Sequence, residues 1–101
     1  MVKAVMIFPH AKPIEINVCV DKLHELMCGP ITILGQTNGH EIPIVYVANA
    51  QLQNTIEAFG TKNRYTPKRF GDAYGPILSL RMDAGIAYDL PLDELMNNYK
   101  T

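Results

Sequence analysis

The residues best suited to chemistry lie in one short segment of the second half of the chain. Residues 62–70 hold four of the nine cationic side chains, and no acidic residue occurs from Ala58 to Gly71. Arginine offers a planar fork of donors that matches phosphate, and an aromatic ring offers a face for a base. The segment therefore predicts a site for an anionic, nucleotide-like small molecule. The candidate ligand-binding residues are Lys62, Asn63, Arg64, Tyr65, Lys68, Arg69, Phe70 and Tyr74.

Two other interpretations of residues 62–70 stay open. The charged side chains can belong to a solvated loop, or they can contact an acidic protein surface. The nearby glycines Gly60, Gly71 and Gly75 favour the anion site, because backbone amides can approach a ligand closely where no Cβ is present.

Residue patterns for catalysis or metal binding are absent from the sequence. His10, His24 and His40 are scattered, and Cys19 and Cys28 do not form a C-x-x-C pair. The G-x-G-x-x-G, Walker A, H-E-x-x-H and G-x-S-x-G motifs are also missing. We therefore expect no metal, no cofactor and no enzymatic activity, although a small enzyme stays open as an alternative. Both cysteines are interpreted as buried apolar side chains in a reducing compartment.

Composition indicates one globular domain over residues 1–101, with 48% hydrophobic and 19% charged residues. The formal net charge of −1 argues against a nucleic-acid partner, because such binders carry a clear positive excess. Neither a signal-peptide pattern nor a run of ~20 apolar residues is present. We therefore expect a cytoplasmic protein with no membrane partner.

The first half of the chain predicts alternating strands and helices. Residues 2–8 form an apolar run typical of a strand buried on both faces, and residues 14–20 alternate like a half-buried strand antiparallel to it. Asp21 is placed to cap a helix over 22–28, which Gly29 ends.

The middle of the chain predicts a hairpin followed by a helix. Strands over 31–34 and 43–48 flank the turn signal Asn38-Gly39. Asn49 is then placed to cap a helix over 50–59.

The rest of the chain begins with a long irregular segment over 61–75. A strand over 76–82, a turn over 83–85 and a helix over 91–99 that starts at Pro91 follow it. The resulting fold class is α+β, a mainly antiparallel sheet of about five strands with two or three short helices. A more barrel-like sheet is the alternative.

Single residues and short motifs along the chain occur in an order that resembles the pattern of a known family. They are Leu23, Leu26, Gly29, Ile31, Asn49 after Val45-Tyr46-Val47, Asn63-Arg64, Gly71-Asp72, Gly75 before Ile77-Leu78, Leu92, Leu95 and Tyr99. In this order they resemble the phage and mobile-element family called domain of unknown function 3846. The chain departs from the family at Pro30, where a second glycine is frequent, and at Thr32 and Ala50, where a glutamate is frequent.

The resemblance implies an origin and assigns no activity, so no catalytic residue is carried over. Small proteins of this kind sit among accessory genes, where many products counter host defences. The resemblance thus favours a non-enzymatic accessory protein that sequesters an anionic nucleotide-like signal in the host-cell cytoplasm. The alternative is an anti-CRISPR-like inhibitor that blocks a host defence protein by surface contact.

The apolar C-terminal region predicts self-association. Small ligand-sequestering proteins gain pocket walls by pairing, and two-fold assembly is the commonest solution. We therefore expect a homodimer or a higher homo-oligomer. The residues that carry this expectation are Ile86, Ala87, Tyr88, Leu90, Leu92, Leu95 and Met96.

Overall fold

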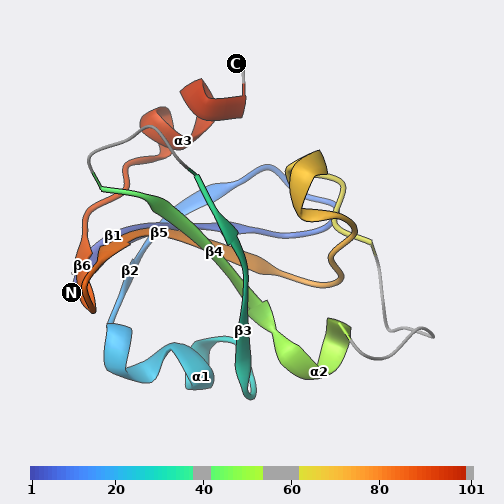
Figure 1. Cartoon of the computed structure of the whole chain (residues 1–101), viewed down its shortest axis with the longest axis horizontal. Helices are drawn as coiled ribbons and strands as arrows, with labels where there is room; N and C mark the ends of the chain where they lie inside the picture. The colour runs from blue at the N-terminus through green and yellow to red at the C-terminus, as the bar shows by residue number, and fades with distance from the viewer. Residues whose placement is uncertain (38–41, 54–61, 100–101) are drawn as a thin grey trace.

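The computed structural model describes residues 1–37, 42–53 and 62–99, and within them an antiparallel sheet carries short helices on both faces (Figure 1). The strands are β1 (Val2–Ile7), β2 (Ile14–Val18), β3 (Ile31–Gln36), β4 (Ile44–Asn49), β5 (Ile77–Asp83) and β6 (Ile86–Tyr88). The helices are η1 (Val20–Lys22), α1 (Leu23–Leu26), α2 (Ala50–Gln53), η2 (Lys68–Phe70) and α3 (Leu92–Tyr99). The predicted α+β class is confirmed.

The sheet is open and has the strand order β2-β1-β5-β4-β3. Strand β6 pairs with β5 from Arg81 to Asp83, just beyond Ser79, where the pairing of β1 with β5 ends. Strands β2 and β3 form the two edges, and no pairing joins them in the described part of the chain. The barrel-like alternative therefore finds no support among these strands.

Both faces of the central strands are buried, which explains why β1 and β4 are almost continuously apolar. Even-numbered residues of β1 and odd-numbered residues of β4 face η1 and α1, and the alternate positions face η2 and α3. The first core contains Ala4, Met6, Val18, Leu23, Met27, Val45, Val47, Leu78 and Leu80. The second core contains Val5, Ile7, Ile44, Tyr46, Ala48, Ala73, Ile77, Leu90 and Leu95.

Helix α1 begins and ends differently from the sequence-based expectation. Neither η1 nor α1 has a side-chain cap, so the capping role predicted for Asp21 is wrong. The helix ends in a Schellman motif, in which the Gly29 amide donates to the His24 carbonyl at 2.9 Å and the Cys28 amide to that of Glu25 at 3.2 Å. Cys28 occupies the left-handed position of this motif, with φ +63°.

The location of this motif corrects the prediction for the cysteines. Cys28 is exposed, because the left-handed residue that ends α1 lies at the protein surface. Cys19 is half-buried, so its predicted burial is only partial.

Helix α2 begins as predicted. The Asn49 side-chain oxygen accepts hydrogen bonds from the amides of Gln51 at 2.8 Å and Leu52 at 3.1 Å. Residues 54–59 of the expected helix and the Asn38-Gly39 turn lie outside the described residues.

The C-terminal segment packs mainly onto its own sheet. Leu90 and Leu95 are fully buried, and Arg81 fixes α3 through Glu94, with Nη2 2.6 Å from the Glu94 carboxylate. Of the residues named above in the apolar C-terminal region, only Ile86 and Tyr88 are exposed. Less apolar surface is therefore free for self-association than the sequence suggests. Among the described residues, no helix has the length and apolar character needed to cross a membrane.

Candidate functional site

Residues 62–72 form an ordered loop whose anchor is Asn63. This side chain is 2% exposed, and its amide nitrogen donates to the carbonyls of Ile7 and Gly75, each at 2.9 Å. Its side-chain oxygen accepts from the Tyr65 amide at 3.0 Å. A side chain with these partners is a structural anchor, so the structure places Asn63 beneath the candidate site.

Further hydrogen bonds tie the backbone of the loop to neighbouring segments. The Asn63 amide donates to the Ala73 carbonyl at 2.7 Å, and the Thr66 hydroxyl donates to the Asn63 carbonyl at 2.9 Å. The Tyr74 amide donates to the Gln53 side-chain oxygen at 2.8 Å, and the Gln53 side-chain amide returns a bond to the Tyr74 carbonyl at 2.8 Å. Tyr74 therefore joins the loop to α2 through its backbone.

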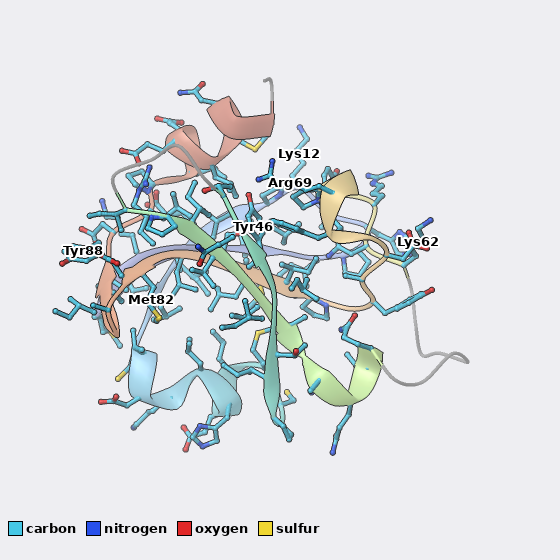
Figure 2. All side chains as sticks on the ribbon, viewed as in Figure 1. Lys12, Tyr46, Lys62, Arg69, Met82 and Tyr88 are labelled. Atoms are coloured by element: carbon cyan, nitrogen blue, oxygen red, sulfur yellow. The ribbon has the colours of Figure 1, made fainter. Side chains whose placement is uncertain are left out.

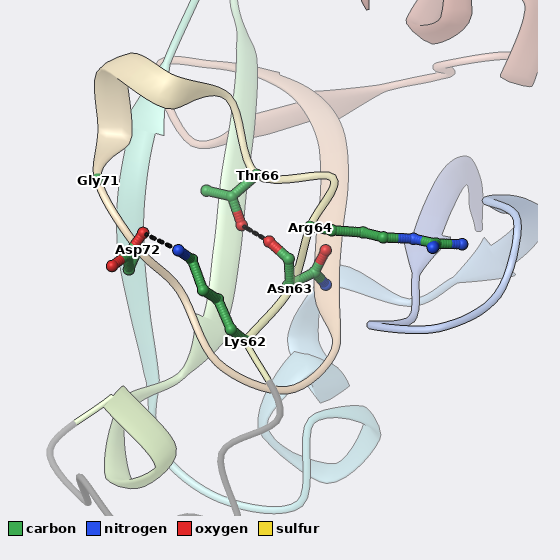
Figure 3. A pocket seen from close by; sticks show the side chains of 6 residues that line it. All are labelled: Lys62, Asn63, Arg64, Thr66, Gly71 and Asp72. Carbon is green, nitrogen blue, oxygen red and sulfur yellow. Dashed lines mark hydrogen bonds and ion pairs between the residues drawn. The ribbon is translucent and has the colours of Figure 1, made fainter.

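A pocket of about 430 Å³ opens beside this anchor (Figure 3). Its lining residues are Lys62, Asn63, Arg64, Thr66, Gly71 and Asp72. Lys62 forms an ion pair with Asp72 at 3.1 Å, and both side chains are mostly exposed. Figure 3 shows Arg64 extending away from this pair, so the two cations of the pocket point in different directions.

Each arginine of the loop lies over an aromatic ring. The Arg64 guanidinium is 5.0 Å from the centre of the Tyr65 ring and also donates to the Tyr65 hydroxyl at 3.1 Å. The Arg69 guanidinium is 4.9 Å from the centre of the Phe70 ring. Both arginines are exposed. Such contacts restrict the motion of a guanidinium while leaving its donors accessible.

The Phe70 ring faces the protein interior. It lies 5.2 Å from the Tyr46 ring at a tilt of 59°, and it packs over Gly35 so closely that a Cβ there would come within 2.3 Å of the ring. Tyr65 also packs against the second core. These two rings position the arginines, and their packing against the core limits the ring surface that can stack on a base.

The structure therefore divides the predicted residues into two groups. Lys62, Arg64 and Arg69 present charge at the surface, while Asn63 and Phe70 support the loop from below. The side chain of Lys68 lies outside the described part of the structure. Figure 2 shows Lys62 at the opposite end of the sheet from Tyr88.

Three lining residues, Thr66, Gly71 and Asp72, are absent from the sequence-based list of ligand-binding residues, although Gly71 was named as a nearby glycine that favours the anion site. Asp72 follows directly after the stretch without acidic residues. Its closeness in sequence to the cationic segment at 62–70 is a signal from which its place in the pocket could have been predicted. Its carboxylate gives the pocket mixed charge. Such a pocket can bind phosphate through its cations and can accept hydrogen bonds from hydroxyl or amino groups through its carboxylate.

Metal-binding clusters of three or more His, Cys, Asp or Glu side chains do not occur among the described residues. No protein-family model matches the chain, and neither a curated protein nor a solved structure matches it. The resemblance to the phage and mobile-element family stays a prediction.

Proposed function

We propose that this chain is a non-enzymatic phage or mobile-element accessory protein that binds and sequesters an anionic, nucleotide-like signal in the host-cell cytoplasm. The observation that carries the proposal is the loop at 62–72, in which a buried asparagine lies beneath a pocket of about 430 Å³ that Lys62 and Arg64 line, and in which each arginine lies over an aromatic ring. A preformed cationic loop loses little conformational entropy when it binds an anion.

The residues of the loop have separate roles in this proposal. Lys62 and Arg64 bind phosphate oxygens, and Asp72 accepts hydrogen bonds from sugar hydroxyls once Lys62 turns to the ligand. A base stacks on the Arg64 guanidinium, which lies 5.0 Å from the centre of the Tyr65 ring. Arg69 is not among the residues that line the pocket and adds long-range attraction to the anion.

The magnitudes indicate which ligands are compatible with the pocket. A charge-assisted hydrogen bond contributes about 1.5–3 kcal/mol, whereas a micromolar complex requires about 8 kcal/mol. Two phosphate contacts alone therefore do not reach micromolar affinity. Stacking of a base, at about 1–3 kcal/mol, has to contribute as well. We accordingly expect nucleotides to bind and inorganic phosphate to bind much more weakly.

The test uses the purified chain and a panel of linear and cyclic nucleotides in calorimetric titrations. Bound ligand is then released by denaturation and identified by chromatography. Recovery of intact ligand supports sequestration, and recovery of a converted product identifies an enzyme instead. Absence of measurable binding across the panel, with the chain folded by circular dichroism, overturns the proposal.

A second candidate function is inhibition of a host defence protein by surface contact. The observation that favours it is the edge strand β3, where Ile33 is 66% exposed and Ile31 is also exposed. An exposed apolar edge strand can add a strand from a partner. In this case Ile33→Lys abolishes capture of the host target while Arg64→Ala has no effect.

The same edge offers a surface for the expected homo-oligomer. Light scattering at micromolar concentration tests this expectation, and a monomeric mass for both the parent chain and Ile33→Lys contradicts it.

A further inference from the structure

A second pocket, of about 640 Å³, lies on the other face of the sheet. It opens where β1 ends, β5 begins and α1 and α2 approach each other. Its lining residues are Met6, Phe8, Leu26, Met27, Cys28, Asn49, Gln51, Leu52 and Pro76. None of them lines the pocket at 62–72, so the two sites are independent.

The pocket is a consequence of how the two helices end and begin. Helix α1 stops after one turn, and Asn49 ties its end to β4 by donating to the Met27 carbonyl at 2.9 Å. The same side chain caps α2 through its oxygen. The helices are thereby held next to each other. Met6 in β1, Phe8 just after β1 and Pro76 just before β5 are left as the floor of the pocket.

Close packing fixes the walls. Leu52 approaches Gly75 so closely that a Cβ at Gly75 would lie 2.6 Å from the Leu52 Cδ1 atom. Asn49 is 5% exposed, and both ends of its amide already have backbone partners. A pocket with walls fixed in this way exists before any ligand arrives, which is typical of small-molecule sites of this size.

The chemistry of the lining selects the class of ligand. Among the lining residues that the structure describes there is no lysine, arginine, histidine, aspartate or glutamate, so a charged ligand would lose its hydration without gaining an ionic partner from them. The thioethers of Met6 and Met27 and the ring of Phe8 form a soft, polarizable surface. Sulfur atoms and aromatic edges make favourable contacts with aromatic rings.

We propose that this pocket binds a small, uncharged and largely apolar molecule that contains an aromatic ring. The polar side chains among the described lining residues are Cys28, Asn49 and Gln51, and the Asn49 amide is used inside the protein. Recognition therefore depends on shape and apolar contact. Because the lining residues are separate from those at 62–72, this second site does not depend on the proposed nucleotide binding.

The test is a titration of the full chain with Nile red, a neutral aromatic dye whose fluorescence increases in apolar surroundings. We expect saturable binding of one dye per chain. Leu26→Trp, which places a larger side chain at the wall of the pocket, should weaken binding by about tenfold or more. His24→Trp is the matched control, because His24 is exposed on the same helix as Leu26 but is not among the residues that line the pocket, and it should leave binding unchanged.

A second readout uses the exposed thiol of Cys28 at the pocket. In a Cys19→Ser background, saturating Nile red should slow the reaction of Cys28 with N-ethylmaleimide. Gln51→Trp replaces Leu26→Trp if circular dichroism shows that the latter is unfolded. Non-saturable fluorescence overturns the proposal, and so does a loss of dye binding in His24→Trp equal to that in Leu26→Trp. A doubled mass together with a Cys28 reactivity that Nile red does not change also overturns it, because a second copy of the chain then covers this surface. Loss of nucleotide binding in Arg64→Ala with unchanged dye binding separates this site from the first.

Discussion

The side-chain amide of Asn63 reaches across 56 residues of sequence to donate a hydrogen bond to the backbone carbonyl of Ile7, at 2.9 Å. Ile7 is the last residue of β1, and Asn63 is the second residue of the cationic loop at 62–72. This contact fixes the loop to the end of a central strand. The position of the surface cations therefore depends on a residue that is itself almost completely buried.

Replacement of Asn63 by alanine should destabilise the fold strongly. The change removes two donors and leaves the carbonyls of Ile7 and Gly75 without these side-chain partners. A buried group left unsatisfied costs about 1–3 kcal/mol, so we expect a loss of about 2–4 kcal/mol in the free energy of unfolding. Urea denaturation measures it, and Asn17→Ala on β2 is the exposed control. A loss below that of the control would show that Asn63 does not anchor the loop.

Replacement of Ser79 by alanine, in contrast, should not lower the free energy of unfolding. Ser79 is completely buried at the centre of the sheet, and its hydroxyl has no hydrogen-bond partner in the described structure. Removing an unsatisfied hydroxyl from the core should leave the free energy of unfolding unchanged or raise it by about 1 kcal/mol.

The matched control for Ser79 is Thr37→Val. Thr37 is also buried, but its hydroxyl oxygen accepts a bond from the Ile44 amide at 3.0 Å. This variant should be destabilised by about 1–2 kcal/mol. Destabilisation of both variants to the same extent would contradict the assignment of Ser79 as unsatisfied.

Replacement of Gly35 by alanine should disturb the cationic loop from below. The new methyl group would lie 2.3 Å from the Phe70 ring, so the ring has to move, at a cost of about 1–3 kcal/mol. Phe70→Leu in the same chain makes room for the methyl group, and the two changes should therefore be non-additive in a double-mutant cycle. Thermal unfolding of the four chains measures the coupling. Additive effects would show that the ring and Gly35 are independent.

The sheet could be predicted from sequence because its signals are local. The apolar run of β1, the alternation in β2 and the cap at Asn49 each lie within a few residues. Strand β6 was missed as a strand, since three residues are too few to show a period.

The support of the cationic loop could not be predicted in the same way. Asn63 lies between two cations, a context typical of an exposed residue, and its partners Ile7 and Gly75 are distant in sequence. The apolar pocket could not be predicted for the same reason. Its floor and walls come from four separate segments that only the tertiary fold brings together.

Replacement of Arg64 and Arg69 together by alanine should separate binding from stability. Both guanidinium groups are exposed, and each contributes to the fold mainly through a contact with one ring, worth about 0.5–1 kcal/mol at an exposed site. The melting temperature should therefore fall only slightly. Affinity for the bound nucleotide should fall by about 100-fold, and its dependence on salt should weaken, since two phosphate-attracting charges are lost. Lys3→Ala with Lys22→Ala removes the same charge from exposed positions outside the loop and should change affinity much less. A large drop in melting temperature would identify the arginines as structural, and unchanged affinity would place the binding surface elsewhere.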